Sequence, residues 1–450
     1  MLHMPDKTSP VSVEQAISLH AATHPSTVAL VVGTEKLDYG QLDCAVRRCS
    51  HSYGDLNGCL VPFRAECSVD TVVRYFGVHR AGGVAVPLER DMPAHLFAQI
   101  QASLVASKCP EGTADVLFTT GTTGRPKGVM VSHVAMLANA DNLVEAQRYH
   151  PGLTFIVAGP LNHVGCLSKL YTTLFSGGTV CLLDGMKDMS AFFSAVTASE
   201  GEAATFLVPT SIRMLMTFAE DSLRKLDGRF EFVETGAAPL MQSDMDRFCT
   251  LLPHARLYNT YASTETGIIA THDYNGGLRL SGCLGKTMKH SEIVIDSLGR
   301  VVCRGRTLMT GYWNNPEQTA DVLTDDGLVT NDLGFIDSEG ILHLLGRNDD
   351  MINVGGYKVS PVEIENLSLA SGMVEDCICL PHHHPLVGTS LQLLVVPKSM
   401  NFSRQVLYEW LRSKMESYKL PHVIQTVDAI ARTSNGKLDR KYYLSSDEDR

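Results

Sequence analysis

A short segment near residue 120, rich in glycine and threonine, carries the clearest chemical pattern in the chain. The apolar run Val116–Phe118 leads into hydroxyl side chains and glycines, and Lys127 follows. The hydroxyl and glycine residues before the lysine are Thr119, Thr120, Gly121, Thr122, Thr123 and Gly124. Glycine lets backbone N–H groups approach a phosphate, hydroxyls add donors and lysine adds a positive charge. The segment therefore predicts a phosphate-binding loop.

Two other interpretations of this loop compete. In the G-x-x-x-x-G-K-[ST] loop of many nucleotide-binding proteins, glycine precedes the lysine and a hydroxyl residue follows it. Here Pro126 precedes Lys127 and Gly128 follows it, so this motif does not fit. A flexible linker of small polar residues is the second alternative. We expect a tight element instead, because a strand precedes the loop and a helical pattern begins at Val131.

The segment resembles the phosphate loop of the adenylate-forming superfamily, which includes acyl- and aryl-CoA synthetases, peptide-synthetase adenylation domains and luciferases. Thr120 stands where the family usually has serine, which keeps the hydroxyl and adds a methyl. Further segments resemble family motifs, in the family's order, over about residues 26–445. The resemblance implies a chain that uses ATP to activate a carboxylic acid.

Two of these segments resemble the adenine and α-phosphate motifs. Residues 235–240 resemble S-G-G-A-P-L, and in the family its small residues, here Gly236, Ala237 and Ala238, pass along the adenine. Residues 259–265 resemble N-x-Y-G-x-T-E and begin with Asn259. By resemblance, Tyr261 stacks on adenine, Thr264 contacts the α-phosphate and Glu265 helps to hold Mg²⁺. A flat ring offers a stacking face and a carboxylate is a hard oxygen ligand, so both residue types suit these roles.

The next two segments resemble the ribose and hinge motifs. Residues 330–332 resemble T-G-D, in which the aspartate, here Asp332, accepts hydrogen bonds from both ribose hydroxyls. Asn331 replaces the glycine, and asparagine tolerates left-handed backbone angles better than most residues. Residues 346–359 resemble G-R-x-x-D-x-I-x-x-x-G. This resemblance implies that Arg347 contacts the ribose and that Asp349 is a hinge, and it places Gly355 and Gly356 on the path of the thiol.

One lysine near the C-terminus completes the motif series. Residues 432–440 resemble P-R-T-x-x-G-K-x-x-R, which identifies Lys437 as the family's adenylation lysine. By resemblance it bridges the attacking carboxylate and the α-phosphate, where a cation suits the negative charge that builds during the reaction. Without the other motifs, such a lysine would be read as a solvated surface charge.

The sequence indicates the acyl pocket less clearly than it indicates the nucleotide site. Residues 160–165 resemble P-L-F-H-x-x-G and place His163, Val164 and Gly165 at the pocket, opposite Ala262, which replaces a family glycine. Adenylation domains for amino acids carry an aspartate just after this histidine, and residues 164–168 contain no carboxylate. Because a buried ammonium without a partner is costly, we expect an unsubstituted or aryl acid. Arg213 could pair a second carboxylate, but a solvated helix arginine is the plainer interpretation.

The assembled residues suit ATP-dependent formation of an acyl-AMP with release of pyrophosphate, followed by transfer to a thiol. Coenzyme A is the expected thiol, and a small carboxylic acid is the other substrate. An acyl carrier protein or an amine as acceptor remains open. A nucleotide-binding module without catalysis is an alternative of another class, against which the joint presence of Lys437, Glu265 and Asp332 argues.

The elements that must position these residues alternate between strands and helices through about residue 300, which favours α/β layers. Short β runs separated by Gly, Asp and Asn follow and indicate a small antiparallel region. We therefore expect a large N-terminal domain of mainly parallel sheets and helices, residues 1–348, which holds ATP and the acid. A small mobile α+β domain, residues 349–450, is expected to carry the adenylation lysine.

Composition excludes several classes of protein. With 44% hydrophobic and 19% charged residues the chain is an ordinary globular mixture. Its net charge of −11 disfavours non-specific nucleic-acid binding, and no apolar run is long enough for a membrane span. The first residues show no signal peptide, and the twelve cysteines lie in mostly apolar runs, so a reducing cytoplasm is expected.

The tract His382–His384 is not expected to bind metal, and Cys377 and Cys379 are expected to pack in a core. The oligomeric state is left open.

Overall fold

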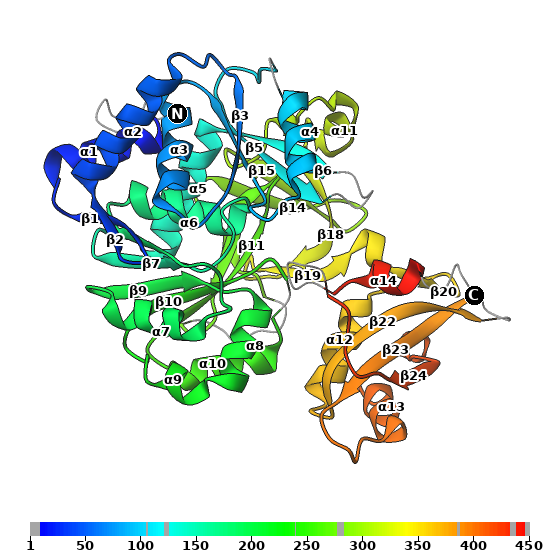
Figure 1. Cartoon of the computed structure of the whole chain (residues 1–450). Coiled ribbons are helices and arrows are strands. Elements are labelled where there is room, and N and C mark those ends of the chain that lie inside the picture. The colour runs from blue at the N-terminus through cyan, green and yellow to red at the C-terminus, as the bar shows by residue number, and fades with distance from the viewer. Residues whose placement is uncertain are drawn as a thin grey trace.

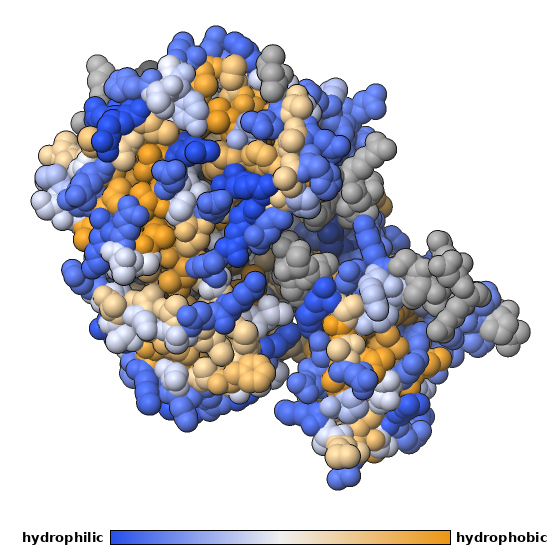
Figure 2. All heavy atoms as spheres, in the orientation of Figure 1, coloured by the Kyte–Doolittle hydropathy of each residue, from blue (hydrophilic) through white to orange (hydrophobic). Residues whose placement is uncertain are grey.

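The computed structural model describes residues 10–104, 107–120, 126–238, 240–276, 283–384, 388–432 and 438–445. A larger body of layered sheets and helices comes first in the chain, and a smaller body follows (Figure 1). In the space-filling view the two bodies meet over a limited region and an open cleft separates them elsewhere (Figure 2).

A nine-stranded sheet forms the middle of the larger body. Its inner strands, from β11 to β1, run parallel, and antiparallel strands close both edges. The strands, in spatial order, are β13 (Lys286–Thr287), β12 (Gly267–Asp273), β11 (Arg256–Ser263), β10 (Phe230–Thr235), β9 (Glu202–Phe206), β7 (Leu153–Val157), β8 (Thr179–Leu182), β1 (Val28–Val32) and β2 (Glu35–Asp38). The mainly parallel sheet expected from the strand–helix alternation is confirmed.

Two further sheets complete the layers of the larger body. The first has the order β16 (Gly311–Tyr312), β6 (Pro126–Ser132), β5 (Thr113–Thr120), β4 (Val84–Leu88) and β3 (Leu60–Arg64). The second consists of β14 (Ser291–Ile295), β15 (Arg300–Gly305), β18 (Gly327–Ile336), β17 (Leu323–Thr324) and β19 (Leu342–Arg347). All pairings in the second sheet are antiparallel, as the short β runs indicated.

Helices cover these sheets, and several of them begin at a residue whose side chain caps the first turn. Ser12 accepts a hydrogen bond from the backbone of Gln15 at the start of the first helix, and Asp38 forms a capping box with Gln41 at the second. The helices are α1 (Val13–Thr23), α2 (Tyr39–Tyr53), α3 (Val69–Arg80), α4 (Ala94–Leu104), α5 (His133–Gln147), α6 (Val164–Phe175), α7 (Met189–Ala198), α8 (Pro209–Phe218), α9 (Glu220–Arg224), α10 (Gln242–Leu251) and α11 (Pro316–Val322). Within the described residues, no helix has the length and apolar character needed to cross a membrane.

The smaller body has a hydrophobic core of its own, drawn from residues 352–420. Its elements are β20 (Ile352–Val354), β21 (Tyr357–Val359), α12 (Pro361–Ala370), β22 (Val374–His384), β23 (Gly388–Pro397), α13 (Arg404–Arg412), β24 (Val423–Thr426) and α14 (Arg440–Ser445), with 3₁₀ turns η1 (Asn348–Asp350) and η2 (Ser417–Lys419). Cys377 and Cys379 are buried in this core, as expected. Ser403 caps the start of α13, which ends at Arg412, and the 3₁₀ turn η2 follows a few residues later.

A buried ion pair links α6 to β10 inside the larger body. The Nζ atom of Lys169 lies 2.8 Å from Oε1 and 2.7 Å from Oε2 of Glu234, and each side chain is 1% exposed. Burial lowers the pKa of Lys169, although the Glu234 carboxylate opposes this shift. Removing one partner of such a pair lowers the free energy of unfolding by more than the intact pair contributes to it, because the other group is left buried and unpaired.

We expect Lys169→Met to lower the free energy of unfolding by about 3–5 kcal/mol, because the Glu234 side chain is then buried without its partner. The double variant Lys169→Met with Glu234→Leu should recover much of this loss. Arg224→Met, which breaks an exposed pair with Glu220, is the control and should cost under about 1 kcal/mol. Urea denaturation of all variants measures these values, and equal stability of Lys169→Met and Arg224→Met would contradict the expectation.

Candidate active site

The two predicted adenine segments follow neighbouring strands of the nine-stranded sheet. Strands β10 and β11 are parallel, with Thr235 opposite Asn259, so both segments lie at the same edge. Gly236 is required there, since an added Cβ would come within 2.8 Å of the Thr260 carbonyl oxygen. Ala237 has a φ of +66° and occupies a left-handed conformation that costs alanine about 1–2 kcal/mol. Its neighbour Ala238 is half-buried.

Asn259 has a structural partner. Its amide Nδ2 donates to the backbone oxygen of Cys283 at 3.0 Å, and the residue is buried. This bond holds the start of the predicted adenine segment against a neighbouring loop. Tyr261, two residues later, lies on the same strand and is 7% exposed, so most of its ring surface contacts protein.

Tyr261, Asp332 and Arg347 come together although they lie far apart in the sequence. The Tyr261 hydroxyl donates to Oδ2 of Asp332 at 2.7 Å, and Nε of Arg347 lies 3.9 Å from Oδ1. Burial, and then the nearby Asp332 charge, raises the pKa of Tyr261 well above its usual value, so the hydroxyl stays protonated and remains a donor. The predicted adenine-stacking residue and the predicted ribose-binding residues thus form one polar cluster.

Asn331 does not need the left-handed backbone that its replacement of a family glycine suggested, because its φ is not positive. Its amide Nδ2 instead donates a hydrogen bond to Oδ2 of Asp349 at 2.6 Å. The residue beside the predicted ribose carboxylate therefore contacts the predicted hinge residue. Asp349 itself lies in the 3₁₀ turn that follows β19.

Glu265 and Lys127 lie on two sides of Tyr312, a residue that the sequence reasoning missed. The Tyr312 hydroxyl donates to Oε1 of Glu265 at 3.1 Å, and Nζ of Lys127 lies 5.2 Å from the centre of the Tyr312 ring. Burial, and then Glu265, raises the pKa of Tyr312. Tyr312 belongs to a two-residue strand, which is too short to show an alternation of apolar and polar residues. The only signal in the sequence was the pair of adjacent aromatic residues Tyr312 and Trp313.

The phosphate loop joins two strands, and the helix expected from Val131 begins two residues later. Strands β5 and β6 form an antiparallel hairpin with Thr119 opposite Lys127, and α5 begins only at His133. Val129 and Val131, on either side of Met130, pair with β5, and Ser132 caps the helix. Thr120 ends β5, whereas Gly121, Thr122, Thr123 and Gly124 lie outside the described residues.

The predicted acyl residues lie at the start of α6. His163 occupies the N-cap position and is half-buried, and the next residue, Val164, lines a narrow cavity together with Thr264. This cavity measures about 10 Å³, which is room for about one water. Ala262 is half-buried and packs against the main core of the larger body.

Phe206, at the end of β9, is a second residue that the sequence reasoning missed. Its ring lies 3.3 Å from a Cβ added at Gly165 and 3.7 Å from one added at Gly236. The ring therefore fills the space between these two small residues. Nζ of Lys169 lies 5.7 Å from the ring centre, so the buried ion pair lies behind it.

Beyond the predicted hinge at Asp349, the smaller body contributes three predicted residues, of which Lys437 lies outside the described residues. Both stems of its segment are anchored: Arg432 contacts both carboxylate oxygens of Asp376 at 2.9 and 2.7 Å, and Arg440 contacts both oxygens of buried Glu365 at 2.7 and 2.9 Å. Gly355 and Gly356 form the exposed turn between β20 and β21 with positive φ values, and an added Cβ would meet no atom within 4 Å.

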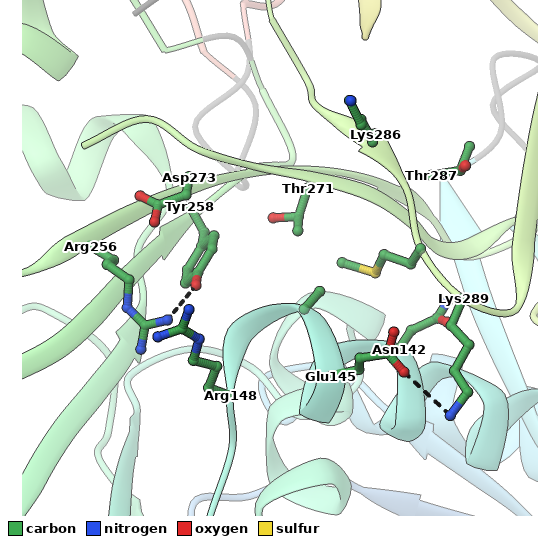
Figure 3. A pocket seen from close by; sticks show the side chains of 12 residues that line it. Asn142, Glu145, Arg148, Arg256, Tyr258, Thr271, Asp273, Lys286, Thr287 and Lys289 are labelled. Atoms are coloured by element: carbon green, nitrogen blue, oxygen red, sulfur yellow. Dashed lines mark hydrogen bonds and ion pairs between the residues drawn. The ribbon is translucent and has the colours of Figure 1, made fainter. Parts of the chain in front are cut away.

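Another cavity, of about 370 Å³, lies away from these residues at the opposite end of β11 (Figure 3). Arg256 and Tyr258, at the start of that strand, line it and are hydrogen-bonded to each other at 2.7 Å. Lys289 also lines it and pairs with Glu145 at 3.3 Å. None of the predicted nucleotide residues lines this cavity, and these charges already have partners.

We expect Asp332→Asn to weaken ATP binding by at least about tenfold, because a hydrogen bond to a charged group contributes about 1.5–3 kcal/mol. The control is Asp326→Asn in the nearby β17–β18 hairpin, where the carboxylate is 91% exposed. Titration calorimetry of ATP with both variants measures the effect. Equal affinities for the two variants would exclude Asp332 from the nucleotide site.

Relatives that match this chain are named as CoA ligases or CoA synthases. The chain is similar to a feruloyl-CoA synthase from Amycolatopsis, with 30% identity over 73% of this chain and 69% of that protein. It is 26% identical to a probable CoA ligase from Humulus lupulus, over 86% of this chain and 80% of that protein.

Solved structures share the fold. Apo MatB from Rhodopseudomonas palustris superposes with a TM-score of 0.82 at 24% identity, over 98% of this chain and 99% of that one. The o-succinylbenzoate CoA synthetase from Bacillus subtilis gives a TM-score of 0.81 at 20% identity, over 95% and 97% of the two chains.

Family models match both parts of the chain. The model described as AMP-binding enzyme matches residues 99–313, and that of the AMP-binding enzyme C-terminal domain matches residues 363–437. These matches include most of the segments from which the resemblance was inferred. The chain therefore belongs to the AMP-binding enzyme family and is an AMP-forming acid–thiol ligase of the acyl-CoA synthetase type.

Proposed function

We propose that this ligase joins coenzyme A to a compact carboxylic acid that lacks an α-ammonium group. The observation that carries the proposal is the position of Phe206, whose ring fills the space between Gly165 and Gly236. A pocket closed in this way suits a short or flat acid better than a long chain. The similarity to a feruloyl-CoA synthase supports an aryl acid as one such substrate.

The charges around the acyl residues support the exclusion of amino acids. The first turn of α6 holds no acidic side chain. Glu234 lies behind Phe206 on the neighbouring strand, but Lys169 already neutralises it at 2.7 Å. An α-ammonium would therefore enter the pocket without a partner, which is costly in a closed site. Arg213 is bonded to Asp244 at 2.6 Å, which supports its interpretation as a helix arginine over a role with dicarboxylic acids.

The proposed reaction has two steps. A carboxylate oxygen of the acid attacks the α-phosphorus of ATP, pyrophosphate leaves and an acyl-AMP forms. The thiol sulfur of coenzyme A then attacks the acyl carbon and AMP leaves. We assign Lys127 and the threonines of residues 119–123 to the phosphates, and Asp332 with Arg347 to the ribose. Lys437 stabilises the charge that builds at the α-phosphate.

Glu265 fits a role in binding Mg²⁺. One of its oxygens, Oε1, accepts a hydrogen bond from Tyr312, so the carboxylate is oriented while Oε2 is left for a cation. Carboxylate oxygens are the ligands that Mg²⁺ takes together with substrate phosphates. When bound, the ion would neutralise phosphate charge. Tyr312 is a positioning residue in this proposal, since it acts through Glu265.

A hinge at Asp349, with domains of residues 1–348 and 349–450, is also part of the proposal. It is supported by the separate core of the smaller body and by the single 3₁₀ turn that links β19 to β20. The small domain would rotate between the two steps, presenting Lys437 first and the turn at Gly355–Gly356 second. The Asn331–Asp349 hydrogen bond belongs to one of these arrangements.

The proposal also names the acyl acceptor and the cellular compartment. Coenzyme A is favoured by the relatives named as CoA ligases, whereas transfer to a carrier protein would use the same nucleotide residues. All twelve cysteines lie in the described part of the chain and none forms a disulfide there, which supports a reducing compartment such as the cytoplasm.

We expect Phe206→Ala to raise kcat/KM for longer acids relative to short ones by about 10- to 200-fold, the range expected for differences in pocket volume. Pyrophosphate release over series of straight-chain, aryl and amino acids measures this profile. The matched control is Phe218→Ala, because Phe218 is 75% exposed. A uniform change across all acids would remove Phe206 from the pocket.

We expect Lys437→Ala to slow ATP–pyrophosphate exchange by about 10²–10³-fold, the usual effect of losing a group that stabilises transition-state charge. Thioester formation from supplied acyl-AMP and coenzyme A should change little. Lys398→Ala, an exposed lysine of the smaller body, is the control. Equal loss of both half-reactions would contradict the role given to Lys437.

A further inference from the structure

Three side chains that could bind a metal meet where α1, α3 and α5 come together, outside the proposed active site. Glu14 lies in the first turn of α1, His79 in the last turn of α3, and His133 is the first residue of α5. One donor atom of each lies within 4.8 Å of the others. Glu14 and His79 are 4% and 5% exposed, and His133 is half-buried.

The hydrogen bonds around His79 leave one ring nitrogen for a further ligand. Its Nε2 lies 2.9 Å from Oδ1 of Asp115, and the Tyr75 hydroxyl donates to Oδ2 of the same carboxylate at 2.9 Å. If Nε2–H donates to Asp115, a neutral His79 ring carries its lone pair on Nδ1. A carboxylate that accepts from the far nitrogen is the usual support of a metal-binding histidine.

Two buried atoms point into the cluster without hydrogen-bond partners among the described residues. These atoms are Nδ1 of His79 and Oε2 of Glu14. Nδ1 lies 3.5 Å from Oε1 of Glu14, which is longer than an ordinary hydrogen bond of about 2.7–3.2 Å. Two ligands about 2.0–2.1 Å from one tetrahedral ion lie about 3.3 Å apart. The spacing thus suits a shared cation better than a direct hydrogen bond.

The balance of buried charges also favours a bound cation. Glu14 and Asp115 bring two negative charges into a buried region, and a divalent cation between neutral imidazoles would cancel both. The competing arrangement is a protonated His79 between the two carboxylates, with His133 as a ring contact whose centre lies 5.2 Å away. That arrangement leaves one carboxylate charge uncompensated.

We propose that Glu14, His79 and His133 form a structural zinc site. Two imidazole nitrogens and a carboxylate oxygen are a donor set that Zn²⁺ accepts, with water at the fourth position. The ion would fasten α1 to the strands of the phosphate hairpin, because Asp115 belongs to β5 and His133 follows β6 directly.

Metal analysis of the full chain without a polyhistidine tag tests the proposal. We expect about one zinc per chain, and after removal by a chelator we expect Zn²⁺ to restore a higher Tm. Replacing zinc by Co²⁺ should give the visible absorption of a four-coordinate site, and X-ray absorption should count two imidazole ligands. Wild-type protein with no bound zinc, and a Tm unaffected by Zn²⁺ and chelator, would overturn the proposal in favour of the protonated histidine.

Amino-acid substitutions test whether zinc binds at the proposed residues. His133→Gln should weaken zinc binding by more than the about 10- to 100-fold that loss of an outer-sphere partner causes. The matched control is His383→Gln, because this exposed histidine belongs to the only three-histidine run of the sequence and contributes to no three-residue metal cluster among the described residues. Retention of zinc by His133→Gln, or its loss from His383→Gln, would also overturn the proposal. Circular dichroism of each variant verifies the fold.

Discussion

The buried ion pair between Lys169 and Glu234 is the constraint around which the acid-binding region is arranged. It joins α6, which begins at the predicted acyl residues, to β10, which ends at the predicted adenine turn. The ring of Phe206 lies against the ammonium on one side and against Gly165 and Gly236 on the other. Because both charges are nearly inaccessible, neither helix nor strand can shift without exposing one of them. The walls of the pocket are therefore held at a fixed separation.

A second constraint concerns the nucleotide. Tyr261 comes from the parallel sheet and Asp332 from the antiparallel one, and the bond between them fixes the two sheets relative to each other at the site. Asn331 extends this link to Asp349, so the strand that carries the proposed ribose carboxylate also contacts the proposed hinge. Nucleotide binding and the position of the smaller body would be coupled through adjacent residues of one strand.

Fold and motif positions could largely be predicted from the sequence. Strand Val28–Val32 and helix caps such as Ser12 are local properties of composition, and the structure agrees with them. The helix expected from Val131 begins two residues later, at His133, because Val129 and Val131 pair with β5 in a strand, which a local pattern does not reveal.

The sequence by itself determined which residues could bind a nucleotide, since their types, order and spacing match a family motif by motif. Only the tertiary structure decided what surrounds them. Phe206 closes the space beside Gly165, Tyr312 orients Glu265, and Glu14 meets His79. These contacts join residues from different elements, far apart along the chain. Their partners are set by how strands and helices pack, and no spacing in a single stretch of sequence records that packing.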